Sequence, residues 1–127
     1  KHIQHVDEVV AGKLKEVLKS VMNKKPAKDF FNTPVDYEKL KLSEHAYRRI
    51  IKSPMDLGRV QRTLNDDGSK VFGDKTYQFT EDFAHDVRLV FKNCFVFNPP
   101  SHHVFKAGRD LCKTFEKEIA RVEHEIE

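Results

Sequence analysis

The first stretch of the chain carries apolar residues at steps of three and four, the spacing that places them on one face of an α-helix. This stripe consists of Ile3, Val6, Val9, Val10, Leu14, Val17, Leu18, Val21 and Met22. Lys24 and Lys25 follow it, where cations favour the negative end of the helix dipole, and Pro26 helps to end the helix. The pattern predicts a long helix over residues 3–25.

Two later segments show the same periodicity. Thr80 is a candidate cap for a helix over residues 80–97, with apolar positions at Phe83, Val87, Val90, Phe91, Cys94 and Phe95. After two prolines, Ser101 is a candidate cap for a last helix over residues 102–125, with its face at Val104, Gly108, Leu111, Phe115, Val122 and Ile126.

A shorter helix is predicted over residues 54–66. Ser53 can cap it, Pro54 suits the first helical position, and Asp56 completes a capping box. Leu57, Val60 and Leu64 then mark its buried side. No segment alternates at period two long enough to predict a sheet, so we expect an all-α fold of four helices.

The stretch between the first two predicted helices, residues 26–52, has no sustained period. So long a connection is unusual in a small helical domain and is typically functional or disordered. Its large apolar side chains argue against disorder: Phe30, Phe31, Val35, Leu40, Leu42 and Tyr47. We expect a packed loop with a helical turn, folded against the helix ends.

The composition is that of one globular domain. With 127 residues, of which 39% are hydrophobic and 34% charged, the chain has room for a single core. It contains no apolar run of bilayer length and no signal-peptide segment, so we expect no membrane association. Because the chain begins at Lys1 without methionine, we expect residues 1–127 to be a monomeric module of a larger protein.

The charges are mostly interspersed, and the net charge of +3 forms no dense face of one sign. Two basic clusters, residues 24–28 and residues 47–52, can contact phosphate. A solvated surface is the simpler explanation of both, and weak nucleic-acid contact remains an open alternative.

No set of residues suggests catalysis, a metal or a cofactor. The seven histidines form no HExxH motif, and there is no CxxC, P-loop or nucleophile elbow. Adjacent helical residues such as His102 and His103 would point about 100° apart, which argues against a shared metal. Cys94 and Cys112 fall within helical patterns and are expected to be buried thiols. We therefore expect a non-catalytic protein.

Asn98 is the most informative polar residue. Pro99 follows it and disfavours a further helical turn, so a carboxamide lies at the end of a helix. An amide beside apolar walls can bind another neutral amide through its N–H and carbonyl groups. The alternative is a simple helix C-terminal residue, because asparagine is common there.

Several segments, in this order and spacing, together resemble the bromodomain family. They are Phe31, residues 34–36 (Pro-Val-Asp), Tyr47, residues 50–58, residues 83–94, and residues 97–99 (Phe-Asn-Pro). The resemblance runs from about residue 8 to residue 120. It implies a left-handed four-helix bundle in which the long loop between the first and second helices and the last interhelical loop form an acetyl-lysine pocket.

The resemblance also implies roles for individual residues. Asn98 would donate to the acetyl carbonyl, and Tyr47 would reach the same oxygen through an ordered water. The walls would be Phe31 and Val35 at the methyl end, Leu40 and Leu42 in the loop, Cys94 in the floor, Phe97 at the rim and Val104 as the gatekeeper. These wall residues would also fit plain core positions, so both readings stay open at this point.

The sequence departs from the family pattern in three places. Asp29-Phe30-Phe31 stands where many relatives have Trp-Pro-Phe, so the aromatic shelf loses a tryptophan and gains a carboxylate. Phe97 stands where a tyrosine is usual, and the segment 42–47 is longer than usual. The Pro-Val-Asp element and the aliphatic Val104 are most similar to the BET-like class.

The resemblance predicts a nuclear reader of acetyl-lysine on histone tails or other acetylated proteins, which recruits its parent protein to chromatin. Two alternatives are a helical nucleic-acid-binding domain that uses Arg48, Arg49 and Lys52, and a scaffold with a degenerate pocket. Because one acetyl-lysine buries little area, we expect affinities on the order of micromolar or weaker.

Overall fold

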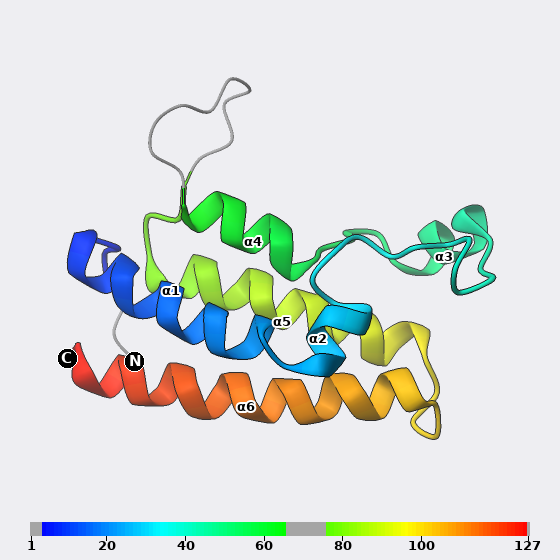
Figure 1. Ribbon diagram of the computed structural model, residues 1–127. Helices are drawn as coiled ribbons and strands as arrows, with labels where there is room; N and C mark the ends of the chain where they lie inside the picture. The colour runs from blue at the N-terminus through cyan, green and yellow to red at the C-terminus, as the bar shows by residue number, and fades with distance from the viewer. Residues whose placement is uncertain (1–3, 66–75, 127) are drawn as a thin grey trace.

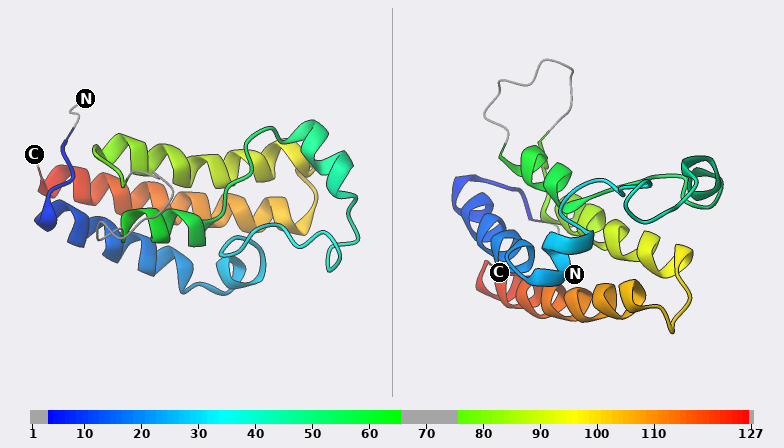
Figure 2. Two further views of the ribbon diagram at one scale, coloured as in Figure 1. Left: turned by 90° about the horizontal axis from the view of Figure 1, so that it is seen from above. Right: turned by 45° about the vertical axis from the view of Figure 1, so that its right-hand side comes forward.

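A computed structural model describes residues 4–65 and 76–126 of the chain. The helices of this part are α1 (Glu8–Met22), α2 (Lys25–Phe30), α3 (Glu44–Ile50), α4 (Leu57–Leu64), α5 (Thr80–Phe97) and α6 (His103–Glu125). α1, α4, α5 and α6 pack side by side, α2 covers one end of the bundle, and α3 stands outside it (Figures 1 and 2). The predicted all-α bundle is confirmed.

The apolar stripes read from the sequence form one core. The large side chains that are almost completely buried come from all four packed helices, and they are Leu14, Leu18, Leu57, Phe83, Phe91, Phe115, Leu111 and Ile119. Burial of each such side chain contributes about 1.5–3 kcal/mol. In the described part of the chain, no helix is both long enough and apolar enough to cross a bilayer.

The first helix is shorter than the predicted 3–25. It begins at Glu8, because Asp7 caps it by accepting the backbone N–H of Val10 at 2.8 Å. Before it, the chain is extended, and His5 forms an isolated β-bridge with Phe79. Residue 3 lies outside the described residues.

The predicted end of the first helix was also misplaced. α1 ends at Met22, and Pro26 lies in the first turn of α2 instead of terminating α1. Proline is tolerated there because the first N–H groups of a helix have no intrahelical partner.

α5 covers the predicted 80–97 and α6 begins one residue after the predicted 102, but the caps of the later helices differ from those predicted. α4 begins at Leu57 with Asp56 as its cap, not at Pro54 with Ser53. α5 has Phe79 at its cap position, so Thr80 is already helical, and α6 is capped by His102 instead of Ser101. α4 ends at Leu64, and residue 66, the predicted end of this shorter helix, lies outside the described residues.

The long connection contains more helix than the single turn expected, since both α2 and α3 lie within it. Its first part is fixed to the start of α4, where the N–H groups of Leu57 and Gly58 donate to the carbonyls of Phe31 and Asn32 at 2.8 and 3.0 Å. A Cβ at Gly58 would lie 2.5 Å from the Asn32 oxygen, so this approach requires glycine. These bonds hold Phe31 over the end of the bundle.

Candidate functional site

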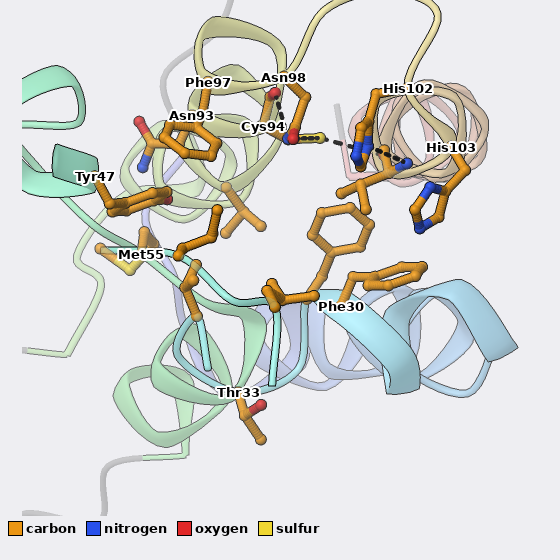
Figure 3. A pocket seen from close by; sticks show the side chains of 16 residues that line it. Phe30, Thr33, Tyr47, Met55, Asn93, Cys94, Phe97, Asn98, His102 and His103 are labelled. Carbon is orange, nitrogen blue, oxygen red and sulfur yellow. Dashed lines mark hydrogen bonds between the residues drawn. The ribbon is translucent and has the colours of Figure 1, made fainter. Parts of the chain in front are cut away.

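A cavity of about 180 Å³ opens at the end of the bundle where α5 ends and α6 begins (Figure 3). Its lining comes from α2, the long connection, α3, α5 and the first turn of α6. The lining residues are Phe30, Phe31, Thr33, Val35, Leu40, Leu42, Tyr47, Met55, Val90, Asn93, Cys94, Phe97, Asn98, His102, His103 and Val104.

All nine residues predicted for the site line this one cavity. They are Asn98, Tyr47, Phe31, Val35, Leu40, Leu42, Cys94, Phe97 and Val104. The fold thus brings together residues as far apart in the sequence as Phe31 and Val104, which are 73 positions apart. Their roles toward a ligand remain predictions.

Asn98 is held at the end of α5 by two hydrogen bonds to the same acceptor. Its backbone N–H and its side-chain Nδ2 both donate to the Cys94 carbonyl, each at 3.0 Å. Its backbone is extended, with φ −102° and ψ 141°, as expected for the residue before Pro99. Nδ2 also donates to Cys94 Sγ at 3.8 Å, a weak bond that a stronger acceptor can replace. This half-buried side chain can therefore offer an N–H and its carbonyl oxygen to a ligand.

Cys94 lies one turn before Asn98 and forms part of the cavity wall. Its thiol is 3.8 Å from Asn98 Nδ2 and donates to the Val104 carbonyl at 3.4 Å. Burial raises the pKa of the Cys94 thiol to about 11, and the contact with Asn98 offsets only part of that shift. The side chain is therefore a neutral thiol at physiological pH, as expected for a small buried hydrophobe.

Tyr47 is the only buried residue of α3, and it connects that helix to the bundle. Its ring packs against Phe97 at 4.7 Å and against Tyr37 at 5.6 Å between centroids. Burial, reinforced by the neighbouring Tyr37 and Cys94, raises the pKa of Tyr47 to about 12. Its phenol is thus a neutral donor throughout the physiological range.

These positions agree with a comparison against known families. The bromodomain family model matches residues 14–110, well over half of the chain. The chain belongs to the bromodomain family. Bromodomains are modules that read acetyl-lysine and are generally non-catalytic.

The matched range includes every residue that lines the cavity of this bromodomain, since the lining runs from Phe30 to Val104. The whole pocket therefore lies within the segment that matches the family. The match does not assign a subtype.

Seven lining residues of this bromodomain were not among the predicted site residues: Phe30, Thr33, Met55, Val90, Asn93, His102 and His103. Asn93 is the most instructive of them. It is buried, and its Nδ2 donates to the Ser53 carbonyl at 2.8 Å, which attaches the segment before α4 to α5. Its spacing of four from Phe97 places it on the same helix face, and that spacing was the available signal.

The prediction that His102 and His103 point about 100° apart is wrong. His102 lies outside the helix, because it is the cap of α6 and its Nδ1 accepts the Val104 N–H at 3.1 Å. The rings of His102 and His103 consequently stack at 4.5 Å, and they do not diverge by a helical step. The described residues still include no cluster of three or more His, Cys, Asp or Glu suited to a metal ion.

The altered shelf does not bring a carboxylate into the pocket. Asp29 is directed toward Lys25, at 2.9 Å, and is not among the residues that line the cavity. Phe30 lines it instead, with its ring 5.7 Å from that of His103 in an edge-on arrangement (Figure 3). Phe30 of α2 and His103 of α6 therefore form an aromatic surface at this edge of the pocket.

Within the described ranges, the lining of the bromodomain pocket contains no carboxylate and no lysine or arginine side chain. An ammonium ion would therefore enter without a carboxylate partner, at a cost of several kcal/mol. A neutral amide finds apolar walls and the Asn98 carboxamide.

Proposed function

We propose that this bromodomain binds acetyl-lysine on histone tails or other nuclear proteins and so recruits its parent protein to acetylated chromatin. The observation that carries the proposal is a pocket whose described lining residues include no carboxylate, lysine or arginine and that has the Asn98 amide in its wall at the end of α5. Acetylation removes the lysine charge and leaves an amide, the form that such a pocket favours.

In this proposal, Asn98 donates its second N–H to the acetyl carbonyl, and Tyr47 reaches the same oxygen through an ordered water. Phe31 and Val35 enclose the methyl group. The protein acts without catalysis, as a single-domain monomeric module, 1–127, in the nucleus. Residues 34–36 and the aliphatic Val104 support a BET-like subtype.

The two basic clusters give limited support to a nucleic-acid-binding function. Arg48 pairs with Glu44 at 3.1 Å, and Lys25 pairs with Asp29 at 2.9 Å, so neighbouring acids partly neutralise both clusters. We therefore favour acetyl-lysine binding over nucleic-acid binding, and the experiment below distinguishes the two.

The test is calorimetric titration of the protein with a singly acetylated histone-tail peptide and with its unmodified twin. We expect only the acetylated peptide to bind, and Asn98→Ala to weaken binding by about tenfold or more, because the acetyl carbonyl loses its buried donor.

The matched control is Asn23→Ala. Asn23 is also a helix C-cap, but it is exposed at the end of α1 and does not line the pocket. Equal effects of the two substitutions, or equal binding of both peptides, would reject the proposal. A DNA affinity that falls steeply with salt would favour the nucleic-acid alternative instead.

A further inference from the structure

Gly108 lies on α6 behind the wall of the pocket, without lining it. A Cβ built at this position would lie 2.8 Å from Cys94 Sγ, 3.4 Å from Phe31 Cζ and 3.5 Å from Phe95 Cε1. The first distance is shorter than non-bonded carbon and sulfur atoms tolerate, and the second is tight. The absence of a side chain at Gly108 therefore sets where Cys94 and Phe31 can lie.

Cys94 and Phe31, whose atoms lie nearest to such a Cβ, both line the cavity, so the open space into which they can move lies on the cavity side. Phe31 cannot retreat easily, because its ring packs edge-on against Phe30 and Phe91 and its carbonyl accepts the Leu57 N–H. Cys94 Sγ stands between Gly108 and the pocket that it lines. A methyl group at position 108 would thus reduce the space inside the pocket by pushing the sulfur inward.

This part of the wall adjoins the Asn98 amide. Cys94 Sγ is 3.8 Å from Asn98 Nδ2, and Phe31 lines the same cavity. If Asn98 binds the acyl carbonyl, the carbon chain beyond that carbonyl meets Cys94 and Phe31. Gly108, which does not line the pocket, would then control how much depth the pocket offers to this acyl chain.

We propose that Gly108 is a specificity-determining residue for acyl length, because the space that it leaves behind Cys94 and Phe31 sets the depth of the pocket. The inference rests on the proposed acyl-lysine site. An added or missing methylene in an apolar pocket changes affinity by about 10- to 200-fold, so a small change in depth is measurable.

The experiment compares one histone-tail peptide carrying acetyl-lysine with the same peptide carrying propionyl-lysine at that position. For the wild-type protein we expect the two dissociation constants to agree within about tenfold. For Gly108→Ala we expect the ratio of propionyl to acetyl dissociation constants to rise by about tenfold or more.

Gly12→Ala is the matched control, since a Cβ at this exposed position of α1 meets no atom within 4 Å. Cys94→Ala and the double variant Cys94→Ala/Gly108→Ala test the mechanism, because removal of the sulfur removes its clash. We expect the double variant to regain propionyl binding relative to Gly108→Ala, and Cys94→Ala alone to favour the propionyl peptide.

An unchanged ratio in Gly108→Ala, with acetyl binding retained, would overturn this inference and leave the proposed function intact. The same holds if the wild-type protein binds the acetyl peptide but rejects the propionyl peptide, or if Cys94→Ala fails to favour the propionyl peptide. Failure of the wild-type protein to bind any acylated peptide would overturn both.

Discussion

Tyr47 combines a buried ring with a polar hydroxyl group, and its environment determines when that group can ionise. In an unfolded chain its pKa is near 10.0, whereas in the folded protein burial raises the pKa to about 12. The folded protein therefore keeps a proton that the unfolded chain loses between these values. Stability contributed by Tyr47 is complete below pH 10 and falls as the pH rises toward 12.

We expect the wild-type protein to lose unfolding free energy relative to Tyr47→Phe as the pH rises from 9 to 11, because phenylalanine cannot ionise. Urea unfolding at several pH values measures the difference. Tyr77, whose pKa is also raised by burial, is present in both proteins and cancels. Parallel pH profiles for the two proteins would contradict the assignment.

At the level of single residues, the sequence was most informative where a family motif fixed the spacing. All nine predicted site residues line the cavity, from Phe31 to Val104. Other lining residues were missed, both within those motifs, as Met55 was, and outside them, as His102 and His103 were. Met55, His102 and His103 reach the pocket only because of how the connection and the first turn of α6 fold, which no local pattern determines.

The start of α4 shows why helix ends are hard to place from sequence. Ser53 and Asp56 are both good caps, and a proline stands between them. The choice is made by tertiary contact, because the Leu57 N–H bonds to the Phe31 carbonyl and Asn93 binds the Ser53 carbonyl. With these groups engaged, the segment before Asp56 stays extended.

Asp56 is buried, and its side chain accepts the Arg59 N–H at 3.0 Å. We expect Asp56→Ala to reduce the unfolding free energy by about 0.5–2 kcal/mol, since the α4 cap is lost. Asp56→Asn keeps a capping oxygen and is the control. Thermal or urea unfolding provides the measurement, and equal losses in both variants would show that the cap is not the cause.

The whole bundle was predictable because four amphipathic stripes of helical length leave few ways to form one core. α2 and α3 were not recognised as helices, since six- and seven-residue segments are too short to show a period.

Surface ion pairs add little to the stability of the bundle. Arg88 bonds Glu116 at 2.7 and 2.8 Å across α5 and α6, but both side chains are nearly half exposed. The core dominates stability.

Phe115 tests this view at the centre of the bundle, where it is fully buried and lies 6.1 Å from Phe83 between ring centroids. We expect Phe115→Ala to lower the unfolding free energy by about 3–5 kcal/mol, because it leaves a cavity. Val96→Ala, at a side chain 55% exposed, should change it by no more than about 0.5 kcal/mol. A small effect of Phe115→Ala in urea unfolding would argue against a single shared core.

The two sides of the pocket differ in how they are built, and the difference bears on kinetics. α5 and α6 belong to the bundle, whereas the opposite side is a connection held by Tyr47 and by the bond from Asn93 to Ser53. We therefore expect ligand exchange to involve the connection more than the packed helices that carry Asn98. Affinity differences among related ligands reside mostly in their dissociation rates. If the protein binds peptides as proposed, we expect substitutions of Leu40 and Leu42 on the connection to change the dissociation rate, as substitution of Asn98 does.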